Sequence, residues 1–304
     1  MTSTIILNEN NIFPDGFNNK LVYNFPNSLS FPNHEICIQN IKMYYSWENV
    51  NDTNLNNNIF YLYFPNSVGG YTANKIVIPN GMYELRDLNA YLQWYCMQQG
   101  YYLIRPNGLN VYFAEFILNT STFTVQLNTY AVSSIAFAEG NGWTVPTGYP
   151  DTTGTIFPII SMYDTTTGSF NNFYKLIGFP SNFNSTTGMT QLNSTKSYLS
   201  TVSPVIQPNE NLLIGISNIE NKYTNPTTLI GTITSDVEFG QLIDYTPPNF
   251  AWVNMLIGTY NGIRILLTGS TGDFVKILDP VITITLAIRN KKDDFLMDEL
   301  KLIK

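Results

Sequence analysis

The hydrophobic positions of the chain fall into short runs of β-branched and aromatic residues, separated by clusters of Gly, Pro, Asn and Asp. Such runs are typical of β-strands. Residues 281–289 alternate most clearly, with Ile282, Ile284, Leu286 and Ile288 on one face and Thr283, Thr285 and Arg289 on the other. This alternation predicts a strand that is buried on one face.

Three further segments have strand patterns. Residues 123–127 alternate between apolar and polar side chains, and residues 58–64 are apolar on both faces, as a covered strand would be. Residues 36–45 predict a long strand whose apolar phase slips at Gln39-Asn40. A slip of one residue indicates a β-bulge at this point.

Two Asn-Gly dipeptides predict β-hairpins. Asn107-Gly108 separates residues 101–104 from 109–113, and Asn261-Gly262 separates residues 252–260 from 263–268. Asn-Gly favours the two positive φ angles of a type I′ turn, which joins antiparallel strands. Antiparallel pairing in turn favours a sandwich or barrel over a parallel α/β sheet.

One prominent helix is predicted over residues 84–99. Its apolar residues recur at helical spacing, and Gly100 can end the helix in the left-handed conformation. A second helix is expected over residues 293–303, where Leu296, Leu300 and Ile303 would form a narrow apolar stripe.

Between about residues 137 and 211 the pattern becomes rich in turns. Segments such as Gly140-Asn141-Gly142 interrupt short apolar runs. Because a structureless loop of this length is uncommon in a compact domain, we expect an insertion here that carries short strands or long loops.

Charge and composition change the picture mainly by what they exclude. Charged residues make up 12% of the chain, about half the roughly 25% usual for soluble domains. Asn, Thr and Ser supply the polarity instead, and a surface of neutral groups suits close packing between subunits. The net charge of −7 and the scattered 15 basic residues argue against nucleic-acid binding.

The sequence also indicates neither a membrane span nor a disulfide framework. No run of about 18 apolar residues occurs. Residues 1–8 lack the basic and apolar regions of a signal peptide. Cys37 and Cys96 are the two cysteines, and we expect both to be buried free thiols.

Candidate chemistry is sparse. His34 is the single histidine, expected at a strand edge in a solvated or hydrogen-bonded state. One His and two Cys cannot form the usual zinc site, and no calcium loop is present, so a metal is conceivable only at subunit contacts.

The nucleophile elbow and the phosphate loop are both absent from the sequence. The Gly-rich residues 269–273 lie between two predicted strands, where a turn is expected. A glycosidase carboxylate pair has no local signature among the 22 acidic residues. We therefore expect no catalytic residues, no cofactor and no enzymatic activity.

Aromatic residues could instead stack on sugars, as in a lectin. The candidates are Tyr44-Tyr45, Tyr61, Tyr63, Trp94-Tyr95 and Tyr101-Tyr102. They fall mostly within predicted strands and the helix, at spacings that favour a core or subunit interface over a ligand platform.

Three stretches together resemble the penton (vertex) capsid proteins of virophages, of the mavirus type, and the related proteins of polinton-like elements. The first is a turn and helix start with Pro79, Gly81, Tyr83, Leu88 and Asn89. The second is an aromatic-leading segment with Phe173, Leu176, Gly178, Phe179 and Pro180. The third runs from residues 240–247 through Asn261-Gly262 to Asp279-Pro280 and the last strand. The order and spacing of these short motifs, over about two-thirds of the chain, carry the resemblance.

The resemblance implies an all-β fold, a single jelly-roll β-sandwich over residues 1–304 with the helix and the inserted region at about 137–211. It implies that five copies form a homopentamer at each vertex of an icosahedral virion, surrounded by trimers of a double-jelly-roll major capsid protein. It further implies assembly in the infected host cell. The alternatives are another minor capsid, cement or spike-base protein, or a carbohydrate-binding β-sandwich.

Overall fold

The computed structural model describes residues 2–152, 156–164, 167–169, 171–185, 190–192, 195–206, 211–270 and 272–291. The chain divides into two compact units. The split unit consists of Met1–Glu48 and Pro208–Lys304, and the inserted unit consists of Asn49–Gln207. Strands predominate in both units, so the expected all-β fold class is confirmed.

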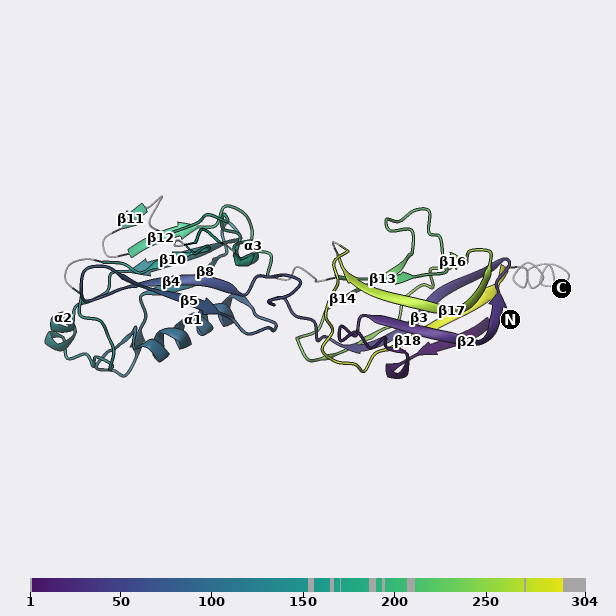
Figure 1. The fold of residues 1–304 in the computed structure, drawn as a ribbon, viewed down its shortest axis with the longest axis horizontal. Coiled ribbons are helices and arrows are strands. Elements are labelled where there is room, and N and C mark those ends of the chain that lie inside the picture. Colours follow the sequence, from purple (N-terminus) through teal and green to yellow (C-terminus); the bar gives the residue numbers. More distant parts are fainter. Residues whose placement is uncertain are drawn as a thin grey trace. The chain divides into compact units, whose positions relative to one another are not determined.

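The split unit is a sandwich of two antiparallel sheets (Figure 1). Its elements are β1 (Thr2–Leu7), the 3₁₀ turn η1 (Glu9–Asn11), β2 (Lys20–Ser30), β3 (His34–Tyr44), β13 (Asn211–Ile216), β14 (Leu229–Thr234), β15 (Leu242–Tyr245), β16 (Val253–Asn254), β17 (Thr259–Gly269) and β18 (Thr283–Asn290). One sheet has the order β1-β18-β3-β15, with β16 also paired to β3, and the other has the order β14-β13-β17-β2.

This strand order is that of a jelly roll. Counted along the unit without the short β16, the sheets contain strands 1-8-3-6 and 2-7-4-5, which is the pairing of eight strands in two Greek keys. The sheets face each other closely, because a Cβ at Gly231 on β14 would lie 3.0 Å from Ile38 Cδ1 on β3. The expected jelly roll is therefore present, and it occupies the split unit rather than residues 1–304 as a whole.

The strand with the clearest alternation forms as predicted. β18 buries Ile284, Leu286 and Ile288 and pairs with β1 and β3. The predicted bulge is also confirmed: Thr285 lies opposite Asn40 and Leu286 opposite Ile38, so Gln39 is the extra residue.

The hairpin predicted at Asn261-Gly262 is wrong. Both residues lie inside β17, where the pairing with β2 shifts between Tyr260 and Gly262. A Cβ at Gly262 would lie 2.4 Å from the carbonyl oxygen of Tyr23. Glycine is required here because the strand bulges and the neighbouring backbone approaches closely. Both are known reasons for a Gly inside a strand, as an alternative to a turn.

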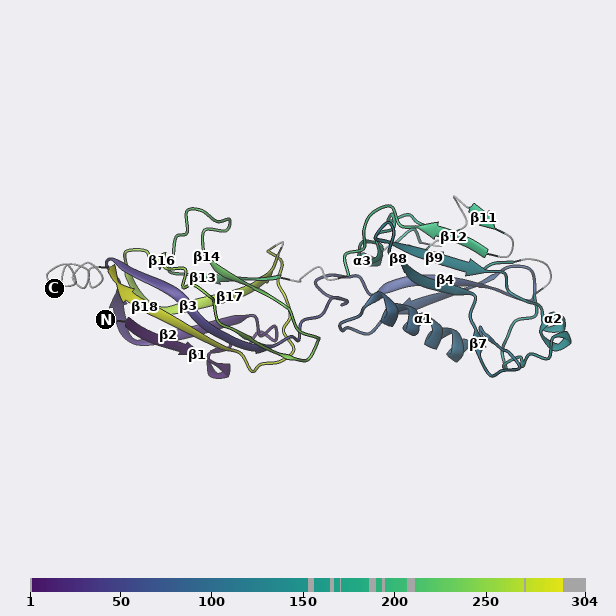
Figure 2. The ribbon, with the colours of Figure 1, turned by 180° about the vertical axis from the view of Figure 1, so that it is seen from behind.

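The inserted unit combines three small sheets with helices (Figure 2). Its elements are β4 (Ile59–Pro65), β5 (Tyr71–Val77), α1 (Leu85–Gln99), β6 (Leu103–Ile104), β7 (Asn110–Val111), β8 (Ala114–Asn119), β9 (Thr124–Tyr130), α2 (Ile135–Gly140), β10 (Ile159–Ser161), α3 (Phe173–Ile177), β11 (Thr190–Leu192) and β12 (Thr195–Leu199). The sheets have the orders β10-β4-β5, β11-β12-β9-β8 and β6-β7.

Helix α1 confirms the prediction for residues 84–99. It buries Leu85, Leu88, Leu92 and Cys96, and Gly100 ends it at φ 73°. The Asn107-Gly108 hairpin is confirmed as β6–β7, although only Gly108 has a positive φ, so the turn is not type I′.

Two expectations for this region differ from the structure. The exposed Phe123 has φ 51° and precedes β9 rather than belonging to it. The inserted unit begins at Asn49 rather than near residue 137. Residues 49–136 contain ordinary strand patterns, so neither composition nor periodicity marks a boundary there. The helix expected over residues 293–303 lies outside the described residues.

Candidate functional site

The residues of the first motif fix a loop at the start of α1. Gly81 exchanges two backbone hydrogen bonds with Val50, at 3.1 and 2.9 Å. A Cβ at Gly81 would lie 3.1 Å from the ring of Tyr83, so the two motif residues are in contact. Pro79 and the rest of this turn connect β5 to α1.

A buried asparagine that the motif does not include holds the same loop. Asn49 is 3% exposed. Its Oδ1 accepts from the backbone N–H of Tyr83 at 2.8 Å, and its Nδ2 donates to the carbonyl oxygens of Tyr83 at 2.7 Å and Ile206 at 2.6 Å. Nothing in the local sequence distinguishes Asn49 from the many other asparagines of the chain.

Asparagine side chains do more in this protein than form the neutral surface that the composition predicts. Buried asparagines also form hydrogen bonds with the backbone of loops. Nine asparagines are buried in the described part of the chain: Asn19, Asn49, Asn51, Asn57, Asn58, Asn74, Asn128, Asn171 and Asn218. Several bond loop backbone, as when Asn57 Nδ2 donates to Asn49 O at 2.8 Å. These amides replace water for buried peptide groups, which would otherwise be costly to leave unpaired.

Motif residues on α1 connect the helix to the sheet. Leu88 is fully buried. Asn89 Oδ1 accepts from the backbone N–H of Phe116 at 2.9 Å. Because β8 is an edge strand, this bond satisfies a donor that has no strand partner, and the helix covers the edge.

The second motif forms α3 and its termination. The Phe173 ring stacks on Phe60 with centroids 4.8 Å apart, and Leu176 is buried. Gly178 has φ 77°, and a Cβ there would lie 2.2 Å from the Val202 carbonyl oxygen. The next motif residue, Phe179, packs on Phe183 at 4.4 Å, and the Pro180 carbonyl accepts from Phe183 N. Both motifs thus lie in the inserted unit and hold its core together.

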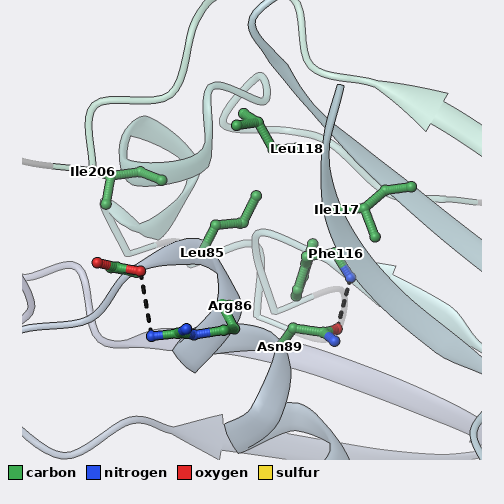
Figure 3. A pocket seen from close by; sticks show the side chains of 8 residues that line it. Leu85, Arg86, Asn89, Phe116, Ile117, Leu118 and Ile206 are labelled. Carbon is green, nitrogen blue, oxygen red and sulfur yellow. Dashed lines mark hydrogen bonds and ion pairs between the residues drawn. The ribbon is translucent and has the colours of Figure 1, made fainter. Parts of the chain in front are cut away.

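An apolar hollow of about 530 Å³ opens beside the first motif (Figure 3). Its walls are Leu85, Phe116, Ile117, Leu118 and Ile206, with Glu84, Arg86 and Asn89 completing the lining. Ile117 and Leu118 on β8 are exposed. The charged rim side chains Glu84 and Arg86 pair with each other at 3.6 Å and are solvated. The hollow offers apolar contact and no reactive group.

Titratable groups give no reactive constellation in the described residues. His34 Nδ1 lies 2.8 Å from the Pro32 carbonyl at the start of β3, in the hydrogen-bonded state expected. Both cysteines are free and buried, also as expected. Burial raises the pKa of the Cys96 thiol to about 12, which keeps it protonated and unreactive at neutral pH. The described part of the chain contains no group of three His, Cys, Asp or Glu side chains placed to hold a metal.

Among the helices of the described residues, none is long and apolar enough to span a membrane.

The split unit exposes apolar side chains at both open sides of its sandwich. On one side, where β1 and β2 are the edge strands, Ile6 is 56% and Leu29 42% exposed. On the other side, β15 exposes Leu242, and the preceding loop exposes Phe239. The outer face of β13 and β17 adds a hollow of about 360 Å³. Each open side of the sandwich thus carries apolar side chains that remain exposed in the single chain.

The aromatic candidates divide between core and surface. Tyr45, Tyr63 and Tyr101 are buried, whereas Tyr44 and Trp94 are exposed. Tyr101 stacks on Phe64 with centroids 4.1 Å apart. The aromatic residues named from the sequence therefore do not form one shared platform.

No family model and no curated protein matches this chain. Among solved structures, it is similar to the mavirus penton protein with 9% identity, a TM-score of 0.42, and coverage of 95% of this chain and 97% of that one. It is also similar to a chain of the Sputnik virophage with 11% identity, a TM-score of 0.37, and coverage of 96% and 99%. Both TM-scores lie below 0.5, so neither similarity supports a conclusion about the function of this chain.

Proposed function

We propose that this chain is a structural capsid protein whose split unit associates side by side with identical copies, five of which close a vertex of an icosahedral shell. The observation that supports this most is the jelly roll with two unlike, apolar open sides: the β1/β2 side with Ile6 and Leu29, and the β15 side with Leu242 and Phe239. Unlike sides favour head-to-tail contacts, which form a ring when the rotation between neighbours closes.

The low charge of the chain assists this association. With 12% charged residues, neighbouring copies can bury interfaces of about 800 Å² each while desolvating few charges, whose burial is costly. The vertex position, the surrounding double-jelly-roll major capsid protein and the location in the virion rest on the order and spacing of the three motifs in the sequence.

The first prediction concerns mass. Recombinant full-length chain is expected to form a species near 172 kDa, five times the 34.4 kDa of one chain, in native mass spectrometry at high concentration. Monomers that become rings only in the presence of shell proteins would also agree, if electron microscopy of particles then shows five copies at each vertex. Stable dimers, together with particle density away from the vertices, would contradict the proposal and favour a cement protein.

A second prediction tests the two sides separately. Ile6→Asp and Leu242→Asp each place a charge on one open side, so each variant is expected to remain monomeric. Mixing the two variants should give dimers, because each retains the side that the other has lost. Tyr223→Asp, at a loop residue that is 99% exposed, is the control and should still form rings.

Analytical ultracentrifugation of the three variants and of the mixture measures which of them form monomers, dimers or rings. If the mixture stays monomeric while Tyr223→Asp assembles, the contact is not head-to-tail. If both edge variants assemble like the unmodified chain, these sides are not the interface.

A further inference from the structure

A second groove, separate from the hollow of Figure 3, has mixed aromatic and polar walls. It measures about 510 Å³ and lies in the inserted unit beside α1, the β6–β7 hairpin, β8 and the segment after α2. The side chains relevant below are Gln93, Arg105, Tyr112, Glu115, Tyr130 and Trp143. Its size falls within the roughly 300–1,000 Å³ usual for small-ligand sites.

The walls of this groove are fixed to one another. Asn110 on β7 donates to the Met97 sulfur of α1 at 3.6 Å. Ile104 on β6 exchanges backbone hydrogen bonds of 3.0 and 2.8 Å with Thr144. Figure 2 shows β7 in the region between α1 and α2. The hairpin therefore joins the helix on one side to the Trp143 segment on the other.

The polar groups inside are held in defined positions. Glu115 Oε1 accepts hydrogen bonds from the Tyr130 hydroxyl and from Asn128 Nδ2, the latter at 3.1 Å. Within the described residues both bonds end on Oε1, which leaves Oε2 for a ligand donor. Burial, and next the hydrogen bond to Glu115, raise the pKa of Tyr130 to about 12, so its hydroxyl keeps its proton at neutral pH.

The aromatic wall is equally well supported. The Arg105 guanidinium carbon lies 5.5 Å from the Trp143 ring centroid. The Trp143 and Phe137 rings form a T-shaped pair, with centroids 6.0 Å apart and ring planes at 82°. The Arg105 side chain lines the groove next to Trp143, where its guanidinium N–H groups can donate to a ligand. One guanidinium and one carboxylate leave the lining without net charge.

We propose that this groove binds a neutral saccharide, with a sugar ring packed on Trp143 and Tyr112. The apolar C–H face of a pyranose fits an aromatic wall, while its hydroxyl groups both donate and accept. They can donate to Glu115 and accept from Arg105 and Gln93. A lining with no net charge gives an anionic sugar no electrostatic advantage, and a purely apolar ligand would leave these polar groups unpaired, which is costly.

The test uses the full chain on an array of glucose-, galactose-, mannose- and N-acetylglucosamine-terminated glycans, with sialylated and sulfated glycans alongside. Binding to at least one neutral class is expected. Titration calorimetry with the best neutral glycan should then show at least tenfold weaker binding for Trp143→Ala and for Glu115→Gln. Trp94→Ala removes an equally large aromatic residue, 46% exposed on α1 and outside the groove, and should bind normally.

Thermal melts of each variant separate lost binding from lost folding. Glu115→Gln preserves the size of the side chain and one acceptor oxygen for Tyr130 and Asn128, and it replaces the other carboxylate oxygen with an amide donor. No binding to any neutral glycan would overturn the proposal. So would binding restricted to sialylated or sulfated glycans, or neutral binding that Trp143→Ala and Glu115→Gln leave unchanged.

Discussion

Gly178→Ala is expected to lower the unfolding free energy of the inserted unit by about 3 kcal/mol or more. The left-handed conformation of Gly178, at φ 77°, costs a residue with a Cβ about 1–2 kcal/mol. The new Cβ would also lie 2.2 Å from the Val202 carbonyl oxygen, and overpacking of this kind adds about 1–3 kcal/mol. Relief of the clash must move Val202, whose N–H donates to the Gly178 carbonyl at 3.2 Å.

Hydrogen exchange measured by mass spectrometry suits this test because it reports the two units separately. Peptides of α3 and β12 should lose protection, while those of β17 and β18 in the split unit should not. Gly108→Ala is the matched control, since Gly108 has φ 80° and a Cβ added there would have no atom within 4 Å. Gly108→Ala should lower the free energy of unfolding only by the cost of the left-handed conformation, about 1–2 kcal/mol. Equal losses for both variants would show that the contact with Val202 is not tight.

The elements that sequence predicts well are those whose signal is local. Helix α1 has apolar residues at helical spacing and a glycine after its last turn, and β18 alternates except at the buried Ala287. Even the bulge at Gln39 is visible as a slip in the pattern of β3. In each case the residues that face the core are near neighbours along the chain.

The features that the sequence does not predict depend on contacts between distant segments. Asn261-Gly262 has the composition of a tight turn, yet β2 pairs across it and requires the glycine for close approach. The boundary of the inserted unit at Asn49 depends on which strands pair, since the patterns on either side are alike. Sequence periodicity reports which face of a strand is apolar and does not report its partner.

The same distinction applies to the sites. The conspicuous motif residues, such as Gly81 and Phe173, turn out to organise the core of the inserted unit. The polar groove depends on Arg105, Glu115 and Trp143, which come from separate segments and carry no shared motif. Only the folded chain brings these three side chains together.

Asn49→Ala is expected to destabilise the inserted unit by about 3 kcal/mol, since it removes the three hydrogen bonds of this buried side chain at about 1 kcal/mol each. The lost partners are the N–H and carbonyl of Tyr83 and the carbonyl of Ile206. Asn80→Ala is the control from the same loop. Among the described residues, the exposed Asn80 side chain bonds only Asp52, at 3.1 and 2.9 Å. Water can replace those contacts, so the loss of unfolding free energy should stay below about 1 kcal/mol.

Asn49→Asp distinguishes lost hydrogen bonds from lost volume, because the side chain keeps its shape. The carboxylate could still accept from the Tyr83 N–H, but it would face two carbonyl oxygens that now lack a donor. Burial and these oxygens would raise the pKa of the introduced carboxyl group above the unfolded value of about 3.9. The folded state would then bind more protons than the unfolded state between the two values, so stability falls as pH rises through that window. Urea unfolding should therefore show a larger loss at pH 7 than at pH 4 relative to the unmodified chain. A loss independent of pH would mean that the loop moves away from residue 49, and that Asn49 does not hold Tyr83 and Ile206 together beside the apolar hollow.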